Sequence, residues 1–263
     1  MAATPLIELD HIYKSFDGER GFAVCDVSIS IESGVFVAMV GTSGSGKTTT
    51  LKTINRLIEP DRGEVRILGK PINTIDAPRL RRQIGYVFQG IGLFPHMTIA
   101  ENIGITPQLL NWPDVDISRR VAELLDLVSL PQHYATRLPD ALSGGEQQRA
   151  GVARAIAARP RIVLMDEPFG ALDAVTHDTL SAAYRQIHDR LGLTTIMVTH
   201  DVQEAVLRAD LIAVMHAGRL LACDTPRMLL SGTADIEVNT LMAAPRRQAE
   251  QIGKLLANDS GPI

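Results

Sequence analysis

A glycine-rich segment with a single lysine is the part of this sequence best suited to chemistry. Its spacing fits G-x-x-x-x-G-K-[ST], and a flexible turn with a chance lysine is the alternative. Glycines let the backbone wrap around a phosphate so that its N–H groups point inward, and the start of a helix adds partial positive charge. Lys47 can reach the β- and γ-phosphates of a nucleotide, and the Thr48 hydroxyl can ligate Mg²⁺. The segment consists of Gly41, Thr42, Ser43, Gly44, Ser45, Gly46, Lys47 and Thr48.

Two carboxylates follow an apolar run later in the chain. Asp166 and Glu167 come directly after residues 162–165. Because ligands of open α/β sheets gather at the carboxyl ends of strands, we expect this pair beside the phosphate loop. Adjacent residues of a strand point in opposite directions, so the two should have separate roles. Asp166 is suited to hold Mg²⁺ through water, and Glu167 to orient or deprotonate water beside the γ-phosphate. A solvated strand end is the alternative.

A histidine ends another apolar run. Residues 194–199 lead into His200, which could contact the γ-phosphate if its strand ends at the same edge of the sheet. Taken alone, a histidine in such a place is more often structural than catalytic. The other histidines have no spacing that is typical of metal ligands.

Apolar runs and helical patterns alternate along most of the chain, and they must position these residues. The runs are continuous, as expected for parallel strands that are covered on both faces. The order favours an α/β fold with a mainly parallel sheet. We expect strands at residues 35–40, 84–88, 162–165, 195–198 and 211–215, and helices at residues 47–58, 119–127, 144–158, 175–191 and 202–209.

Three parts of the chain depart from this rhythm. Residues 5–33 carry apolar side chains largely at every second position, which predicts an antiparallel strand group. Residues 90–142 contain several prolines and no clear strand, which predicts a helical insertion. The apolar rhythm weakens after Pro226. In this last part, residues 244–256 could form a short amphipathic helix, for which a solvated face is favoured over a membrane contact.

Composition and charge exclude several classes of protein. The 263 residues are 45% hydrophobic and 21% charged, which excludes a disordered chain, a collagen and a coiled coil. The net charge of −4 gives no bulk basic excess that would indicate nucleic acid. Cys25 and Cys223 are too few and too far apart for a disulfide framework or a zinc site. We see no secretory signal and no apolar run near the roughly 20 residues that cross a bilayer, so any work at a membrane needs a partner.

The segment that separates families of phosphate-loop proteins lies 19 residues before the acidic strand. Its first residues are Leu142, Ser143, Gly144, Gly145 and Glu146, followed by Gln147, Gln148 and Arg149. Ser143 and the two glycine amides, at a helix start, form a second anion-binding site. A serine-capped helix start with a glycine turn explains Ser-Gly-Gly but not the full string.

With this string the chain resembles the ATP-binding subunits of ABC transporters, from about residue 6 to residue 230. Residues 142–147 look like the signature motif of that family, and Gln89 resembles the glutamine of its Q-loop. Ala171, Leu172 and Asp173 resemble the D-loop, and His200 the switch histidine. Phe16 falls where the family has an aromatic residue that stacks on adenine, with Tyr13 as the alternative.

The resemblance implies a fold and a site. The fold is a P-loop NTPase core with a mainly parallel sheet, an N-terminal antiparallel β group and a helical insertion at about 90–150. The implied ABC ATPase domain covers residues 1–230, and a short tail at 231–263 follows it with no separate regulatory domain. ATP lies on Phe16, on the phosphate loop and on Thr49, with Mg²⁺ at Thr48, Gln89 and Asp166. Glu167, His200 and Gln89 are the implied catalytic residues.

The resemblance also implies partners. Two subunits pack head to tail, so that Leu142, Ser143, Gly144, Gly145, Glu146 and Asp173 of one chain act on ATP held by the other. Membrane-spanning permease subunits dock near the Q-loop, where Ile91, Leu93, Phe94 and Met97 could form an apolar patch or fill the core of the insertion. A periplasmic or lipid-anchored solute-binding protein takes part indirectly, and no nucleic acid is expected. The implied location is the cytoplasm, peripheral on the inner face of the cell membrane.

The residue sequences of two segments resemble those of importers of osmoprotectants such as glycine betaine, choline and carnitine. These segments run from Gln89 to His96 and from Asp166 to Asp173. We expect no regulation by ionic strength through an added C-terminal domain. Alternatives are an importer of another small solute, a split exporter and, less favoured, a soluble ABC ATPase that acts on nucleic acid or ribosomes.

Overall fold

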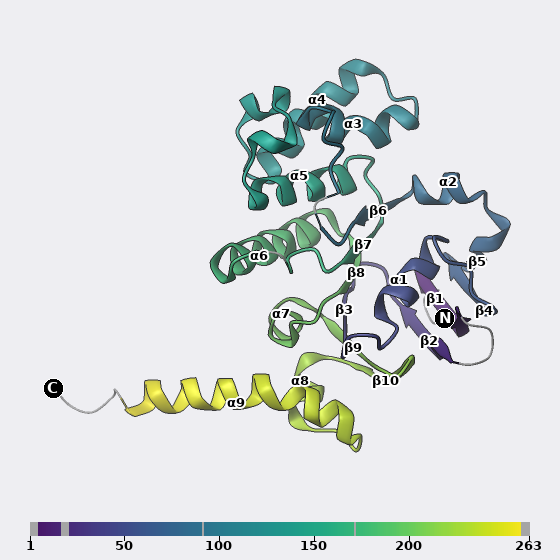
Figure 1. Cartoon of the computed structure of the whole chain (residues 1–263), viewed down its shortest axis with the longest axis vertical. Helices are drawn as coiled ribbons and strands as arrows, with labels where there is room; N and C mark the ends of the chain where they lie inside the picture. The colour runs from purple at the N-terminus through teal and green to yellow at the C-terminus, as the bar shows by residue number, and fades with distance from the viewer. Residues whose placement is uncertain (1–4, 17–20, 91, 171, 259–263) are drawn as a thin grey trace.

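The computed structural model describes residues 5–16, 21–90, 92–170 and 172–258. Its centre is a six-stranded sheet with the order β10-β9-β3-β8-β7-β6 (Figure 1). The strands from β9 to β6 run parallel to their neighbours, whereas β10 is antiparallel to β9. The strands are β3 (Phe36–Val40), β6 (Ile84–Val87), β7 (Ile162–Asp166), β8 (Thr194–Val198), β9 (Leu211–His216) and β10 (Arg219–Asp224).

The central strands are apolar throughout because both faces of the sheet are covered. Every residue of β3, β7 and β8 is buried. This burial explains the continuous apolar runs, because a strand without an exposed face has no position for alternating polar residues. The predicted α/β fold with a mainly parallel sheet is confirmed.

A second sheet holds the N-terminal part of the chain. Its four strands have the antiparallel order β2-β1-β4-β5, formed by β1 (Ile7–Ser15), β2 (Phe22–Ile31), β4 (Arg62–Ile67) and β5 (Lys70–Pro71). The predicted antiparallel group of residues 5–33 supplies β1 and β2. The later strands β4 and β5 complete the sheet and were not predicted.

The helical insertion lies at one end of the molecule, at the top of Figure 1. It consists of α3 (Ile99–Leu109), α4 (Asp114–Leu127), two short turns, η2 (Gln132–Thr136) and η3 (Pro139–Ala141), and α5 (Gly144–Ile156). The helix α3 packs against both α4 and α5. The helix α4 begins earlier than predicted because Asp114 and Asp116 occupy its first turn, where acidic groups favour helix formation.

The remaining helices before the C-terminal part lie beside the two sheets. They are α1 (Lys47–Ile54), the turn η1 (Ile72–Thr74), α2 (Ala77–Arg81), α6 (Ala174–Leu191) and α7 (Val202–Arg208). The predicted helix 47–58 is too long, since α1 ends at Ile54. Arg56 has φ 55, outside the right-handed helical region. Its guanidinium donates to the carbonyl oxygens of Ile75 at 2.6 Å and of Ile72 at 3.2 Å.

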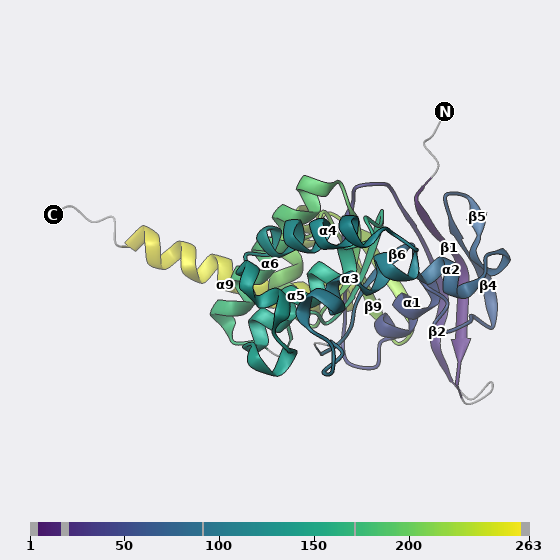
Figure 2. The same cartoon turned by 90° about the horizontal axis from the view of Figure 1, so that it is seen from above.

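The C-terminal part consists of α8 (Pro226–Ser231) and α9 (Ile236–Asn258). Near the start of α9, Val238 and Met242 are buried in the main hydrophobic core, and α9 packs on α7 and α8. Its far end extends away from the rest of the protein in both views (Figures 1 and 2). The predicted helix 244–256 lies within α9, which occupies most of the expected C-terminal tail at 231–263, and residues 259–263 of that tail lie outside those described. Within the described ranges, no helix has both the length and the apolar character needed to cross a membrane.

Candidate functional site

The glycine-rich loop connects β3 to α1, as predicted. Gly46 has φ 96, and a Cβ placed on it would come within 2.3 Å of the Ala23 carbonyl oxygen. A Cβ on Gly41 would come within 2.0 Å of the Met215 carbonyl oxygen. Glycine is therefore required at both positions so that the loop can lie against the ends of β2 and β9.

The Lys47 side chain folds back over this loop. Its Nζ donates to the carbonyl oxygens of Gly41 and Thr42, both at 2.9 Å, and to Ser45 Oγ at 3.3 Å. Burial lowers the pKa of Lys47, and the carboxylates of Glu167 and Asp166 oppose that shift. The ammonium group is thus held among backbone oxygens, in a place where phosphate oxygens can take over its hydrogen bonds.

Thr48 and Asp166 bring oxygen atoms together beside the loop. Thr48 Oγ1 donates to Asp166 Oδ1 at 2.7 Å, and Lys52 Nζ lies 4.0 Å from Asp166 Oδ2. Asp166 is only 2% exposed. Hydroxyl and carboxylate oxygens are the donors that Mg²⁺ prefers, together with water and substrate phosphates. The donor set therefore fits a magnesium ion held by Thr48 and Asp166.

Glu167 lies just beyond the end of β7, with different partners from Asp166. Its φ of 46 is in the left-handed region, and its amide donates to the Val198 carbonyl oxygen at 2.9 Å. Glu167 Oε2 accepts a hydrogen bond from Gln89 Nε2 at 3.4 Å and lies 3.5 Å from His200 Nδ1. The structure thus brings the three candidate catalytic side chains together around one carboxylate oxygen.

These residues share one open pocket of about 550 Å³. The phosphate loop contributes one wall, and the side chains of Gln89, Glu167 and His200 contribute the other. The pocket is lined by Ala23, Ser43, Gly44, Ser45, Gly46, Lys47, Thr48, Thr49, Gln89, Glu167 and His200. A phosphate chain seated on the loop would therefore have a carboxylate, an amide and an imidazole beside it.

The two aromatic candidates for contact with the base differ in exposure. Phe16 follows β1, is 61% exposed, and has Lys14 Nζ at 5.8 Å from the centre of its ring. Tyr13 packs edge-on against Phe22, with ring centres 5.7 Å apart. Phe16 does not line the pocket that the structure describes, but its side chain is exposed enough for a base to stack on it.

The second predicted anion site lies at the start of α5. Ser143 Oγ accepts a hydrogen bond from the Glu146 amide at 3.4 Å, and Glu146 Oε2 accepts from the Ser143 amide at 2.8 Å. The Ser143 hydroxyl also donates to Glu146 Oε2 at 2.8 Å, and the two hydrogen bonds that this carboxylate accepts from Ser143 lower the pKa of Glu146. Leu142 is buried, whereas Ser143 and Gly144 are exposed. The helix start is therefore capped by its own side chains and also faces outward.

Gly145 and Asp173 connect this region to α6. A Cβ on Gly145 would come within 2.9 Å of Thr176 Cγ2, so that α5 and α6 approach closely only with glycine here. Asp173 begins α6 and accepts a hydrogen bond from the Thr176 amide at 3.1 Å. Neither Asp173 nor any of residues 142–146 lines the phosphate-loop pocket.

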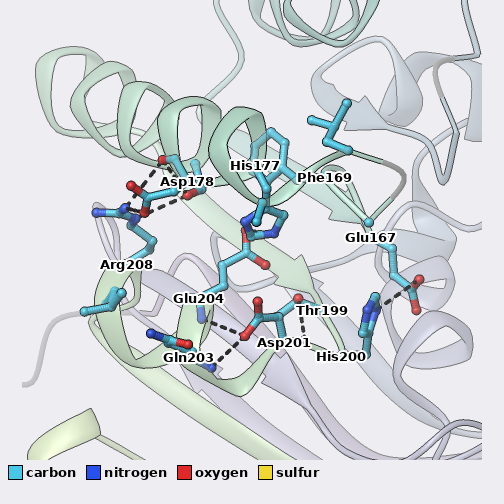
Figure 3. A pocket seen from close by; sticks show the side chains of 15 residues that line it. Glu167, Phe169, His177, Asp178, Thr199, His200, Asp201, Gln203, Glu204 and Arg208 are labelled. Atoms are coloured by element: carbon cyan, nitrogen blue, oxygen red, sulfur yellow. Dashed lines mark hydrogen bonds and ion pairs between the residues drawn. The ribbon is translucent and has the colours of Figure 1, made fainter. Parts of the chain in front are cut away.

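Two contacts near the site, made by Lys52, His177 and Glu204, were not predicted from the sequence. Lys52 lies one helical turn after Thr48, and this i, i+4 spacing could have placed it beside Asp166. His177 lies one turn after Asp173, and Glu204 one turn after His200. His177 Nε2 lies 3.5 Å from Glu204 Oε1, beside a second pocket of about 430 Å³ that Glu167 and His200 also line (Figure 3).

The surface near Gln89 contains a mainly apolar groove of about 610 Å³ between β6, α3 and α5. Phe88, Phe94 and Leu109 line it and are each at least 41% exposed. Of the predicted apolar patch, Leu93 packs against the main core, Met97 is partly exposed, and Ile91 lies outside the described residues. The groove also contains Arg81, Arg82 and Arg154.

Comparison with known proteins gives consistent matches. A family model described as "ABC transporter" matches residues 24–170. The carnitine transport ATP-binding protein of Listeria monocytogenes is 46% identical over 241 residues, which are 92% of this chain and 60% of that protein. The glycine betaine uptake system ATP-binding protein of Escherichia coli is 45% identical over 230 residues, which are 88% of this chain and 74% of that protein.

Solved structures agree with these matches. A dimeric ATP-binding cassette in a post-hydrolysis state, bound to ADP and Pi, has a TM-score of 0.75 and 33% identity, and the match covers 84% of this chain and 99% of that one. The chain spans about 60% of the length of the first curated relative described above.

Proposed function

Since the chain belongs to the ABC transporter family, we propose that it hydrolyses ATP as the energy-coupling subunit of a complex that imports a small solute. The observation that carries this proposal is one pocket that the Lys47 loop, Thr48 and the side chains of Gln89, Glu167 and His200 line together, with Asp166 hydrogen-bonded to Thr48 behind it. Phosphoryl transfer to water requires a phosphate cradle, oxygen ligands for a metal ion and a group that orients water.

The phosphate loop binds the substrate. The loop amides point at the β- and γ-phosphates of ATP, and Lys47 exchanges its hydrogen bonds to Gly41 and Thr42 for phosphate oxygens. Thr49 lies next in the pocket wall, and the ring of Phe16 stacks on the adenine. Thr48, Asp166 and Gln89 would hold Mg²⁺, which would neutralise phosphate charge when bound.

Glu167 acts on the attacking water. Its carboxylate orients the water and accepts a proton from it, since Oε2 faces the pocket beside Gln89 and His200. His200 is exposed and contacts the γ-phosphate. Its neighbour on the other side of Oε2, Gln89, keeps the carboxylate directed toward the phosphate loop.

Two chains complete each other's site. Ser143 and Gly144 are exposed at the start of α5, Gly145 and Glu146 beside them are half-buried, and none of the four lines the pocket of its own chain. In a head-to-tail dimer these residues, with Leu142 and Asp173, cover the γ-phosphate of ATP bound to the partner. The dimeric cassette of known structure supports this arrangement.

The groove beside Gln89 receives a membrane-spanning permease. Its exposed aromatic side chains and its arginines suit a short amphipathic helix from such a partner. Attachment through this groove would place the chain at the inner face of the cell membrane. The groove belongs to the ATPase domain, which covers residues 1–230.

The cargo that the relatives favour is an osmoprotectant such as glycine betaine, choline or carnitine. The test is uptake of labelled glycine betaine after a salt upshift, in a strain that lacks other betaine carriers. Cells with Lys47→Ala should lose the uptake that wild-type cells show. If uptake persists while the variant chain is present at the membrane, glycine betaine is not the cargo, and a screen of other solutes follows.

A further inference from the structure

The ion pair between His177 and Glu204 joins two helices, one that begins after the predicted site residue Asp173 and one that begins two residues after His200. His177 lies in the first turns of α6, which starts after Asp173, and Glu204 lies in α7, which starts after Asp201. The atoms His177 Nε2 and Glu204 Oε1 are 3.5 Å apart (Figure 3). The pair therefore lies between the loop of Asp173 and the loop of His200.

Glu204 is an unusual side chain for such a place. Only 5% of the residue is exposed, and its Oε1 makes no hydrogen bond within the described structure. Burial raises the pKa of Glu204, the nearby Asp201 adds to this, and Thr199, His177 and His200 oppose it. A buried carboxyl that lacks a full set of hydrogen bonds costs stability. The fold thus keeps a costly group opposite His177.

The contacts on either side of the pair form a continuous path. On one side, the His177 amide donates to the Asp173 carbonyl oxygen at 2.8 Å. On the other side, the Glu204 amide donates to Asp201 Oδ1 at 3.1 Å, and Asp201 directly follows His200. The path continues from His200 Nδ1 to Glu167 Oε2 at 3.5 Å. Asp173 is thereby connected to Glu167 through these two hydrogen bonds, the close contacts of His177 and of His200, and the peptide bond between His200 and Asp201.

We propose that His177 and Glu204 are positioning residues that couple the two ATP sites of a dimer. This inference rests on the proposed function, in which Asp173 acts on the partner's ATP and His200 acts on ATP of its own chain. When ATP bound to the partner fixes the position of the Asp173 loop, the pair His177 and Glu204 fixes the positions of the His200 and Glu167 side chains in turn. Neither residue touches the substrate.

The same two helices are joined by a second ion pair that provides a matched control. Arg208 at the end of α7 pairs with Asp178 and also donates to Ser181 Oγ at 3.3 Å. Asp178 follows His177 in sequence, but its side chain is 70% exposed. Arg208 lies at the opposite end of α7 from His200, so this pair fastens the helices without reaching the site.

The experiment compares ATP hydrolysis by the wild-type chain with that of His177→Ala, Glu204→Ala, the double variant and Asp178→Ala. Hydrolysis is measured against ATP concentration, nucleotide binding with a fluorescent ATP analogue, and folding by thermal unfolding. The charged and titratable groups around the pair are Glu167, Asp178, Asp201, His200 and Arg208, and a fixed pH keeps them constant. Should His177→Ala fail to fold, His177→Gln takes its place.

We expect each single variant at the pair to lower kcat by about tenfold, since small displacements of positioned groups have large effects on rate. The Hill coefficient of hydrolysis against ATP concentration should fall toward one from a value of about two, which is the upper limit for the paired sites of a dimer. ATP binding should stay unchanged, and the double variant should be no slower than either single one.

Two outcomes overturn the inference. One is a wild-type Hill coefficient in the variants at the pair, and the other is an equal loss in Asp178→Ala. A wild-type chain that folds and binds no ATP, or binds ATP without hydrolysing it under any condition, would instead contradict the proposed function.

Discussion

Thr48 at the start of α1 donates a hydrogen bond to Asp166 at the end of β7, 118 positions later in the chain, over 2.7 Å. This hydrogen bond joins the phosphate loop to the acidic strand end before any ligand is bound. Two motifs that were predicted separately are thus parts of one preformed site. Ligands bind more tightly to such a site because less ordering remains to be done.

Replacing Lys47 with alanine should weaken ATP binding. The variant loses the charged hydrogen-bond donor that covers the loop, and we expect the Kd to rise by about tenfold to a hundredfold. Equilibrium binding of a fluorescent ATP analogue measures the change. Lys52→Ala is the matched control, because Lys52 is a more exposed lysine of the same helix and forms only a 4.0 Å ion pair with Asp166. Equal losses in both variants would contradict the role of Lys47.

Replacing Glu167 with glutamine should leave ATP binding intact and slow hydrolysis by about a hundredfold or more, since the amide cannot accept a proton. A nucleotide that is bound but not hydrolysed should hold two chains together. Size-exclusion chromatography with ATP would then show a dimer for the variant, and rapid phosphate release would show a role for Glu167 other than the one proposed.

Phe16→Ala should raise the Kd for ATP by about tenfold, in line with stacking of about 1–3 kcal/mol per base. Tyr13→Ala should change it little, because the Tyr13 ring already packs against Phe22. Binding of ATP and of inorganic triphosphate to each variant separates loss of base contact from damage to the phosphate loop. A larger effect from Tyr13→Ala on ATP alone would assign the stacking to Tyr13.

The contribution of Glu146 to stability should depend on pH, and a second helix start of the same kind provides a control. Glu146 caps α5 with Ser143, and Glu101 caps α3 with Thr98, each with a lowered pKa because amide and hydroxyl groups donate to the carboxylate. A lowered pKa in the folded state stabilises the protein above the unfolded pKa of about 4.3, and that stability is lost as pH falls through the folded pKa.

Glu146→Gln and Glu101→Gln should therefore each be less stable than wild type at pH 7 and approach wild-type stability in acid. Urea unfolding at a series of pH values measures this. Only Glu146→Gln should also slow hydrolysis, because α3 contributes nothing to the proposed dimer site. Equal hydrolysis by the two variants would place Glu146 outside that site.

Much of the fold could be predicted because the central strands are buried on both faces. The continuous runs of β3, β7 and β8 needed no long-range information. The end of α1 did need it, since Arg56 leaves the helix to reach the carbonyl oxygens of Ile72 and Ile75. These partners lie in a segment whose position depends on the second sheet.

The site was predictable where a motif carries its own geometry and less so elsewhere. The phosphate loop and the pair Asp166 and Glu167 could be found from spacing alone. The left-handed backbone at Glu167 and its contacts with Gln89 and His200 depend on how three separate strands end at one edge. His177 and Glu204 carry no motif, and only the packing of α6 on α7 shows that they meet.

The separation of the phosphate-loop pocket from residues 142–146 within one chain has a consequence for genetics. A chain with Lys47→Ala still offers an intact α5 start, and a chain with Ser143→Arg still offers an intact loop. When both defective chains are made in one cell, each mixed dimer has one intact ATP site. The Ser143→Arg chain supplies the loop of that site, and the Lys47→Ala chain supplies its serine. Two inactive alleles of this single gene should then complement each other, whereas two alleles damaged in the loop should not.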